Sequence, residues 1–346
     1  MQYLLDYSTQ SLSEILEQIA LKDDYSVKVQ AYRSQQILEW VYKKGIKKIS
    51  EMSNIPLEMR NLLTDNFQIY PLHITEVLQS RDKEAEKYLF QTTDNRWVEA
   101  VRIIHPERNT LCISSMVGCP LGCQFCATSY LENKRNLSTG EIISQFLLLY
   151  HEKPVQNVVF MGMGEPLLNL ENVLEAMDYI SEPKLLNFSR RRFTISTAGI
   201  ISGIEKLITT HEKAQLAVSL NSPFQEEREN IMPVTRSNRL EDLFSMLKKY
   251  NDYNGRFTFE YIVLPGVNDS HKHAEAIIRL RKRMDFNLNV IMFNGFSGSP
   301  FSGATREEVK RFLSYFYSTP VEAVERLSKG ADIAAGCGQL AARKNI

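Results

Sequence analysis

Residues 112–129 read CISSMVGCPLGCQFCATS, and this stretch decides the fold class. It places Cys119, Cys123 and Cys126 in the spacing C-x3-C-x2-C, directly after the apolar, strand-like run TLCISSM that begins at residue 110. Thiolates on a loop at the carboxyl end of a barrel strand can converge on one face, where the catalytic groups of such barrels collect. The pattern therefore predicts a metal centre at the rim of a parallel barrel.

The number of cysteines in this loop matters as much as their spacing. Ordinary [4Fe-4S] clusters take four cysteines and structural zinc sites close with four ligands, so a trio leaves one metal position free. The alternatives are a zinc site completed by a remote residue, or three buried thiols acting as small hydrophobes. Gly118 and Gly122 let the backbone wrap closely, and Phe125 precedes the last cysteine where it can pack against an adenine. This motif resembles that of the radical S-adenosylmethionine (SAM) superfamily.

Strand-like segments recur between helical ones along the rest of the chain. Six of them are nearly apolar throughout and begin at residues 110, 157, 193, 215, 257 and 288. This alternation implies a parallel sheet covered by helices, and the number of strands suits a partial barrel better than a closed eightfold one. We therefore expect an α/β fold, a partial (β/α)6 TIM-like barrel, over residues 109–346.

The region before the barrel has a different pattern. Residues 1–75 are expected to form a small helical accessory domain, with one helix ending at Gly45 and another starting at Pro56. Residues 76–108 are expected to form a β linker or edge. The apolar stripes of the first two helices are Ile15, Leu16 and Ile19, and then Ile37, Trp40 and Val41.

Composition and charge exclude some classes of protein. Of the 346 residues, 43% are hydrophobic and 24% are charged, which is ordinary for a globular chain. No apolar run approaches the roughly 18 residues needed to span a bilayer, and MQYLLDYSTQ has no secretory pattern, so we expect a cytosolic protein without a membrane segment. The 41 basic and 41 acidic side chains cancel, so nucleic acid must be bound by a local basic patch.

The second strand leads into FMGMGEPLLN at residues 160–169. In the radical SAM superfamily the comparable turn contacts the amino group of SAM, although a simple tight turn would be the better interpretation without the cysteines. Other strand ends carry small polar groups. Each of these alone could be a turn residue whose hydrogen bonds are satisfied within the protein, but together they can orient a ligand. The expected cofactor-binding residues are Phe125, Gly164, Glu165, Ser196, Ser219, Leu220, Asn221 and Asn294.

Two further cysteines lie outside the trio. Cys112 precedes it, and Cys337 lies in ADIAAGCGQLAA, where flanking glycines leave the thiol approachable. Alone, each would more often be an inert buried thiol. Together with YRSQQILEWVYKKG, CQFCAT, FMGMGEPL, ISTAGI, LPGVNDS and DIAAGCGQL, they make the chain resemble the RlmN/Cfr family of dual-specificity RNA methyltransferases over essentially its whole length.

The resemblance implies a role for each of these groups. One SAM methylates Cys337, and a second is reductively cleaved at the single [4Fe-4S] cluster, so two are used per turnover. The radical formed removes hydrogen from the methylated sulfur, and the resulting methylene radical adds to an adenine. Glu99 matches the family's proton acceptor, with a solvated strand carboxylate as the alternative. Cys112 then forms a disulfide with Cys337 and frees the product.

The implied substrates are an adenine of 23S ribosomal RNA at the peptidyl-transferase centre and an adenine in the transfer-RNA anticodon loop. GEPLLN resembles the RlmN motif, which favours methylation at C2; C8 methylation in the manner of Cfr, or a non-catalytic iron-sulfur RNA-binding protein, are the alternatives. A monomer and an electron donor such as flavodoxin or ferredoxin are also expected.

The chain departs from the family pattern at two places. Asn221 stands where the family usually has histidine, and asparagine cannot carry a proton at neutral pH, which puts any acid-base duty there in doubt. GCGQL replaces the commoner ACGQL, a change expected to loosen the catalytic loop.

Basic side chains on the helical module and the barrel are candidate phosphate contacts. A solvated basic face is the alternative. With the family resemblance, we expect the module to grip RNA while the barrel receives a splayed-out base. The candidates are Arg33, Lys43, Lys44, Lys47, Lys48, Lys134, Arg135, Arg190, Arg191 and Arg192.

Overall fold

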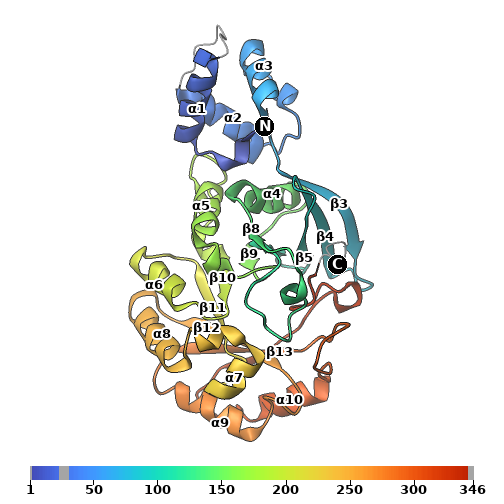
Figure 1. Cartoon of the computed structure of the whole chain (residues 1–346), viewed down its shortest axis with the longest axis vertical. Coiled ribbons are helices and arrows are strands. Elements are labelled where there is room, and N and C mark those ends of the chain that lie inside the picture. Colours follow the sequence, from blue (N-terminus) through green and yellow to red (C-terminus); the bar gives the residue numbers. More distant parts are fainter. Residues whose placement is uncertain (1, 23–30, 342–346) are drawn as a thin grey trace.

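The structure is a computed structural model that describes residues 2–22 and 31–341. Residues 1, 23–30 and 342–346, which belong to the expected accessory and barrel regions, lie outside this description. Figure 1 shows an elongated molecule with a helical module at one end and the strand-and-helix core below it.

Three helices make up the module: α1 (Thr9–Lys22), α2 (Ala31–Tyr42) and α3 (Leu57–Asn66). A short parallel pair, β1 (Gln2–Tyr3) and β2 (Phe67–Gln68), ties its start to its end. The predicted apolar stripes point inward, since Leu16, Ile37 and Val41 are fully buried. Pro56 is the residue before α3 and not its first helical residue, a shift of one position.

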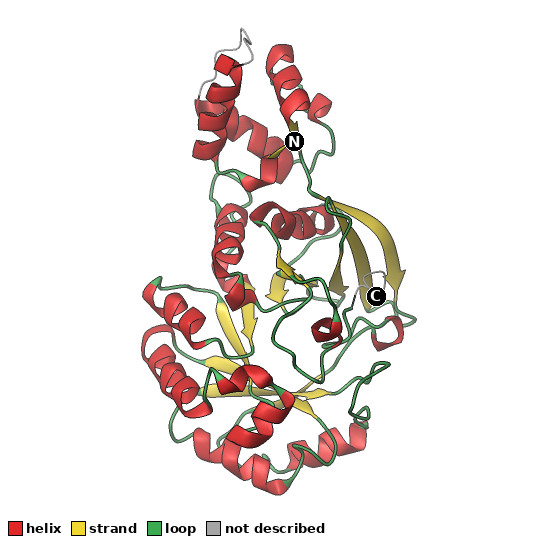
Figure 2. Cartoon of the chain, in the orientation of Figure 1, coloured by secondary structure: helices red, strands yellow, loops and turns green. Residues whose placement is uncertain are grey.

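The β linker or edge predicted after the module consists of three strands, β3 (Leu72–Gln79), β4 (Ala85–Thr92) and β5 (Trp97–Ile103). They pair antiparallel with one another, and β5 continues antiparallel onto β6 (Thr110–Cys112). Figure 2 shows them as the curved flank of the main sheet. They are therefore an edge of the same sheet that carries the barrel strands.

The six predicted barrel strands are all present and parallel. They are β6, β9 (Asn157–Phe160), β10 (Phe193–Thr197), β11 (Gln215–Ser219), β12 (Phe257–Val263) and β13 (Phe286–Met292). A seventh parallel strand, β14 (Ala323–Arg326), pairs with β13 and was missed, because it has only two apolar residues, none of its residues is buried, and it gives no apolar run. The order β14-β13-β12-β11-β10-β9-β6-β5-β4-β3 leaves the sheet open, which confirms a partial barrel.

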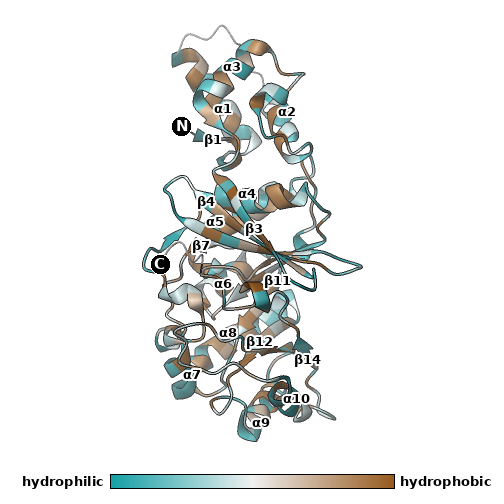
Figure 3. Ribbon diagram, turned by 90° about the vertical axis from the view of Figure 1, so that its right-hand side faces the viewer, coloured by the Kyte–Doolittle hydropathy of each residue, from teal (hydrophilic) through white to brown (hydrophobic). Residues whose placement is uncertain are grey.

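Helices connect these strands and cover them. They are α4 (Thr139–Tyr150), α5 (Leu170–Ser181), α6 (Ile201–Thr209), α7 (Gln225–Ile231), α8 (Leu240–Asn254), α9 (His271–Leu280) and α10 (Arg306–Ser314). Figure 3 shows hydrophilic colours on α9 and α10, at the end of the molecule away from the module. No helix of the described residues has the length and apolarity that crossing a membrane requires.

Candidate active site

A cavity of about 140 Å³ opens where the parallel strands end. Cys119, Cys123 and Cys126 line it from the loop after β6, and Cys337 lines it from the C-terminal segment. Of the predicted cofactor-binding residues, those that also line it are Phe125, Gly164, Glu165, Ser196 and Ser219. The fold thus brings four thiols and the GEP turn, distant in sequence, to one place.

The loop that carries the three cysteines is closed at its base by β7 (Met116–Val117) paired with β8 (Arg135–Asn136). Gly118 and Gly122 both have positive φ, +65° and +72°. A Cβ on Gly118 would lie 2.9 Å from the Asn133 carbonyl oxygen, so the loop needs glycine there. These two residues let the chain turn back twice within one short loop.

The donor set of this loop fits an iron-sulfur cluster. Burial raises the pKa of Cys119 to about 12 and that of Cys123 well above its ordinary value, so without a metal these thiols hold their protons. Within residues 2–22 and 31–341, no three His, Cys, Asp or Glu side chains lie close enough to hold a single metal ion. A [4Fe-4S] cluster binds each thiolate on a different iron, and three separate thiols around one cavity suit it.

The turn after β9 shows why two glycines precede Glu165. A Cβ on Gly162 would lie 2.6 Å from Ser114 Oγ, and one on Gly164 would lie 2.5 Å from Met116 Cβ. The turn therefore packs directly against the strand that leads to the cysteines.

Glu165 itself is buried and already partly hydrogen-bonded. Its Oε1 accepts from the Leu167 N–H at 3.1 Å, and its Oε2 accepts from the Ala198 N–H at 2.7 Å. Burial raises the pKa of Glu165 to about 7, against these hydrogen bonds. The carboxylate is thus held at the cavity wall, where its remaining lone pairs can accept from the amino group of a ligand.

Three other predicted cofactor-binding residues do not line the cavity. Leu220 is fully buried, and Asn221, at 1% exposure, uses Oδ1 to accept from the Ile262 N–H at 2.9 Å. Asn294 lies beside the C-terminal segment, where a Cβ on Gly336 would be 2.8 Å from its Nδ2. Among the small polar groups at the strand ends, Ser196 and Ser219 line the cavity, whereas Asn221 supports the end of β12.

The segment with Cys337 rests on the cysteine loop. The Ala127 N–H donates to the Gly338 carbonyl oxygen at 2.7 Å, and Thr128 Oγ1 donates to the Leu340 carbonyl oxygen at 2.6 Å. Gly338 has a φ of +79°, which favours glycine at this turn. These contacts place the half-exposed Cys337 thiol over the cavity.

Glu99 and Cys112 lie on the neighbouring strands β5 and β6. Glu99 is only 4% exposed; Oε1 is 3.2 Å from Lys87 Nζ and Oε2 accepts from the Ala341 N–H at 3.0 Å. The alternative of a solvated strand carboxylate is therefore wrong. Burial, helped by the neighbouring Cys337, raises the pKa of Cys112 to about 12. All five cysteines are free thiols, so the expected Cys112–Cys337 disulfide is not present in this structure.

Sequence reasoning missed three residues near these thiols: Met161, Glu260 and Arg326, all of which line the cavity. Glu260 was detectable, because it is the one carboxylate in the apolar run FTFEYIVL. Arg326 ends β14, the strand that the pattern did not predict.

Arg228 of α7 was also missed, and it is fully buried. Its guanidinium donates to the carbonyl oxygens of Ala198, Ser219 and Leu220 at 2.6, 2.8 and 2.9 Å, and to Thr235 Oγ1 at 2.6 Å. Burial lowers its pKa to about 10, so it remains charged at neutral pH. Arg228 therefore joins the ends of β10 and β11 to α7.

Replacing Arg228 with methionine is expected to lower the free energy of unfolding by about 3 kcal/mol or more, because four buried acceptors lose their donor. Urea unfolding followed by circular dichroism measures this. The matched control is Arg236→Met at a neighbouring exposed arginine, which should leave the unfolding midpoint unchanged. Equal midpoints for the two variants would show that the Arg228 hydrogen bonds do not hold the strand ends together.

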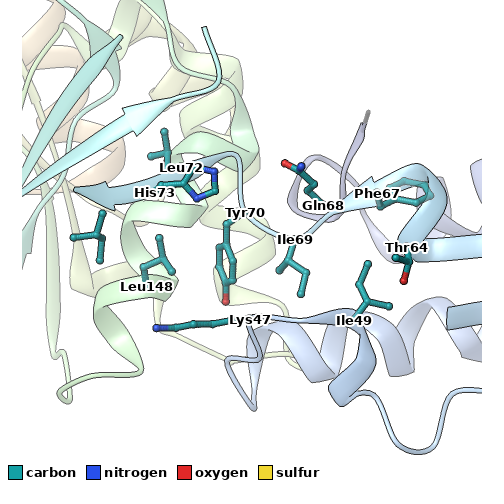
Figure 4. Close-up of a pocket in the computed structure, with 11 residues that line it drawn as sticks. Lys47, Ile49, Thr64, Phe67, Gln68, Ile69, Tyr70, Leu72, His73 and Leu148 are labelled. Atoms are coloured by element: carbon teal, nitrogen blue, oxygen red, sulfur yellow. The ribbon is translucent and has the colours of Figure 1, made fainter. Parts of the chain in front are cut away.

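Among the predicted phosphate contacts, two arginines have acidic partners within the fold and one lysine borders a cavity. Arg135 pairs with Asp94 and Glu141, both at 2.7 Å, and Arg190 pairs with Glu212, so these two arginines already have internal partners. Lys47 instead borders an open cavity of about 580 Å³ between the module and the core. Figure 4 shows Lys47, Tyr70 and His73 around it.

Comparisons with known proteins agree with this geometry. Residues 113–280 match the radical SAM superfamily, and residues 3–69 match the ribosomal RNA large subunit methyltransferase N-terminal domain. The dual-specificity RNA methyltransferase RlmN of Geobacter sulfurreducens is 40% identical over 89% of this chain and 86% of its own; that of Campylobacter hominis is 37% identical over 98% and 97%. A radical SAM methyltransferase structure from Sphaerobacter thermophilus superposes with a TM-score of 0.92 at 33% identity, covering 99% of this chain and 100% of its own. The chain therefore belongs to the RlmN family of radical SAM RNA methyltransferases.

Proposed function

We propose that this enzyme methylates C2 of an adenine in 23S ribosomal RNA at the peptidyl-transferase centre, and an adenine in the transfer-RNA anticodon loop. The observation that carries this proposal is the single cavity lined by the cysteine trio, the Glu165 turn and Cys337. Family membership supports the choice of RNA, and the proline after Glu165 favours C2 over C8.

Binding of the cofactors falls to the cavity wall. Cys119, Cys123 and Cys126 would hold the [4Fe-4S] cluster, while Glu165 would accept a hydrogen bond from the amino group of SAM. When bound, the cluster and SAM together supply the radical that an adenine carbon without an acidic proton requires. The chain's own part is to hold both against Cys337 and to keep water out of the cavity.

Cys337 is the residue we assign as methyl carrier. Its segment is fixed to the cysteine loop by the Ala127 and Thr128 hydrogen bonds, so the sulfur stays beside the cavity while its thiol remains half-exposed. A thioether on Cys337 would present its methyl group both to the cavity and to an incoming base. This placement favours a protein-bound methyl group over direct transfer.

Release of the product would use Cys112 and Glu99. The Cys112 sulfur attacks the Cys337 sulfur, the S–S bond forms and the S–C bond breaks; the electron pair stays on the new methyl carbon, which takes a proton. Before this release, the radical adduct would return its unpaired electron to the cluster and the adenine ring would lose a proton. Glu99 Oε1, whose charge Lys87 balances at 3.2 Å, is the assigned acceptor for that proton. A thiol reductant must then restore both cysteines.

Replacing Cys112 with alanine is expected to leave RNA covalently attached to Cys337, since the attacking thiol is missing. Denaturing gel electrophoresis with labelled RNA would show a slower protein-RNA band that a nuclease removes. As a control, the Cys112→Ala, Cys337→Ala double variant should give no such band. Free methylated RNA released by Cys112→Ala at the wild-type rate would contradict the assigned role.

We also propose that the enzyme uses two SAM per turnover, takes electrons from flavodoxin or ferredoxin, is monomeric and cytosolic, and binds RNA through the helical module. The division into residues 1–75, 76–108 and 109–346 is likewise a proposal.

The deciding experiment is anaerobic reaction of the reconstituted enzyme with competing 23S and transfer-RNA fragments, followed by mass spectrometry of the nucleosides. We expect 2-methyladenosine in both fragments. Formation of 8-methyladenosine would replace the C2 assignment with C8, and no methylated adenosine from a cluster-loaded enzyme would contradict the proposed function.

A further inference from the structure

Arg326 has no place in the chemistry described so far, although it lies among the catalytic groups. It ends β14 and lines the same cavity as Cys337. It is the one cationic side chain among the described residues that line this cavity. A fixed positive charge near thiols that must act as nucleophiles can affect how readily they lose their protons.

The guanidinium of Arg326 is held from two sides. Its Nη1 lies 3.3 Å from Glu260 Oε2 on β12 and 3.0 Å from Met161 Sδ after β9. Glu260 is fixed in turn by Asn289 Nδ2, which donates to Oε1 at 3.0 Å. Residues of β12, of β13 and of the turn after β9 therefore set the position of one cation.

Met161 also connects Arg326 to Cys112. The Met161 backbone N–H donates to the Cys112 thiol, while its sulfur contacts the arginine. The charge of Arg326 opposes the effect of burial on the pKa of Cys112. Burial disfavours the charge of Arg326, yet Cys337 and Glu260 raise the pKa of Arg326 overall. Arg326 and the thiols thus favour each other's charged forms.

The other charged groups around Cys337 do not duplicate this effect. Glu165 and Glu260 face the cavity and are acidic, as are the three cluster thiols when ionised. On the outer side of the segment, Lys87 donates to the Ala334 carbonyl oxygen at 3.3 Å but is paired with Glu99. Arg326 therefore supplies the positive charge on the cavity side.

We propose that Arg326 is a positioning residue that stabilises the thiolates of Cys337 and Cys112, with Glu260 as the counter-ion that holds the guanidinium in place. The thiol proton leaves to solvent, and the sulfur keeps the electron pair that forms the S–CH3 or S–S bond. The catalytic use of these thiolates rests on the proposed function. The physical effect, a more reactive Cys337 thiol, is measurable without RNA or turnover.

The test measures alkylation of Cys337 by iodoacetamide against pH, by peptide mass spectrometry. The protein is cluster-loaded, anaerobic and SAM-free, so that the cluster protects its own ligands. Relative to wild type, Arg326→Met should alkylate about 10-fold more slowly at neutral pH, with its pH midpoint raised by about one unit. Arg326→Lys should recover most of the rate. Glu260→Gln, which removes the ion pair that holds the guanidinium in place, should alkylate more slowly than wild type.

The outcomes separate this inference from the proposed function. Iron content and the visible absorbance of the cluster confirm that each variant is loaded. An Arg326→Met protein with the wild-type midpoint would overturn the role of Arg326, and a Glu260→Gln protein as fast as wild type or faster would overturn that of Glu260. If wild-type enzyme makes no 2-methyladenosine, but the pH midpoints of Cys337 alkylation still differ between wild type and Arg326→Met, the proposed function is contradicted and the role of Arg326 stands.

Discussion

Replacing Cys337 with alanine is expected to reduce RNA methylation by at least about 10⁴-fold, because the methyl group loses its only carrier. No other described thiol can substitute for it. Cys112 is buried on β6 with a pKa raised to about 12 by burial, and the remaining three cysteines line the cavity as cluster ligands. The measurement is 2-methyladenosine formed under anaerobic conditions.

The Cys337→Ala protein also has to be shown intact. Its iron content and its binding of SAM should match wild type. The segment around Cys337 is held by hydrogen bonds to the backbone carbonyl groups of neighbouring residues, and these bonds do not involve the Cys337 sulfur. Persistent methylation with a loaded cluster would mean that the methyl group passes to RNA without resting on the protein.

Replacing Cys123 with alanine is expected to have the second large effect, loss of the iron-sulfur cluster and of all reductive SAM cleavage. A cluster held by two thiolates has lost a third of its protein ligands, and the Cys123 side chain that would be removed is buried. Iron content, the visible absorbance and release of 5′-deoxyadenosine after reduction give three readouts.

Gln124→Ala is the matched control for this variant. The Gln124 side chain is exposed, and its backbone N–H, which donates to the Ile231 carbonyl oxygen at 3.0 Å, is retained. This protein should bind iron like wild type. A Cys123→Ala protein that keeps a full cluster would show that the three cysteines are not the ligand set.

Much of the fold could be predicted from the sequence because its barrel strands are short apolar runs separated by amphipathic helices. The strand β14 could not, since Ala323–Arg326 has only two apolar residues and owes its conformation to pairing with β13. The open sheet edge and the continuation through β5 likewise depend on pairing, which local pattern does not specify.

In the candidate site, too, residues in local motifs could be predicted, whereas residues placed by distant partners could not. The cysteine trio and the Gly164-Glu165 turn are local motifs, and both line the cavity as expected. The direction of Asn221 depends on the distant Ile262 N–H, and burial of Glu99 depends on Lys87 and Ala341. The Arg326–Glu260 pair joins two strands, one of them unpredicted, so only the folded chain reveals it.

The most direct test of the central claim uses SAM whose methyl group carries three deuterium atoms. If the methyl rests on Cys337 and loses one hydrogen there before transfer, the adenine product carries two deuterium atoms and one hydrogen from solvent. Mass spectrometry of the 2-methyladenosine, together with a labelled methyl group on the Cys337 peptide, is the result the account predicts. A product that retains all three deuterium atoms, with no label on Cys337, would contradict it.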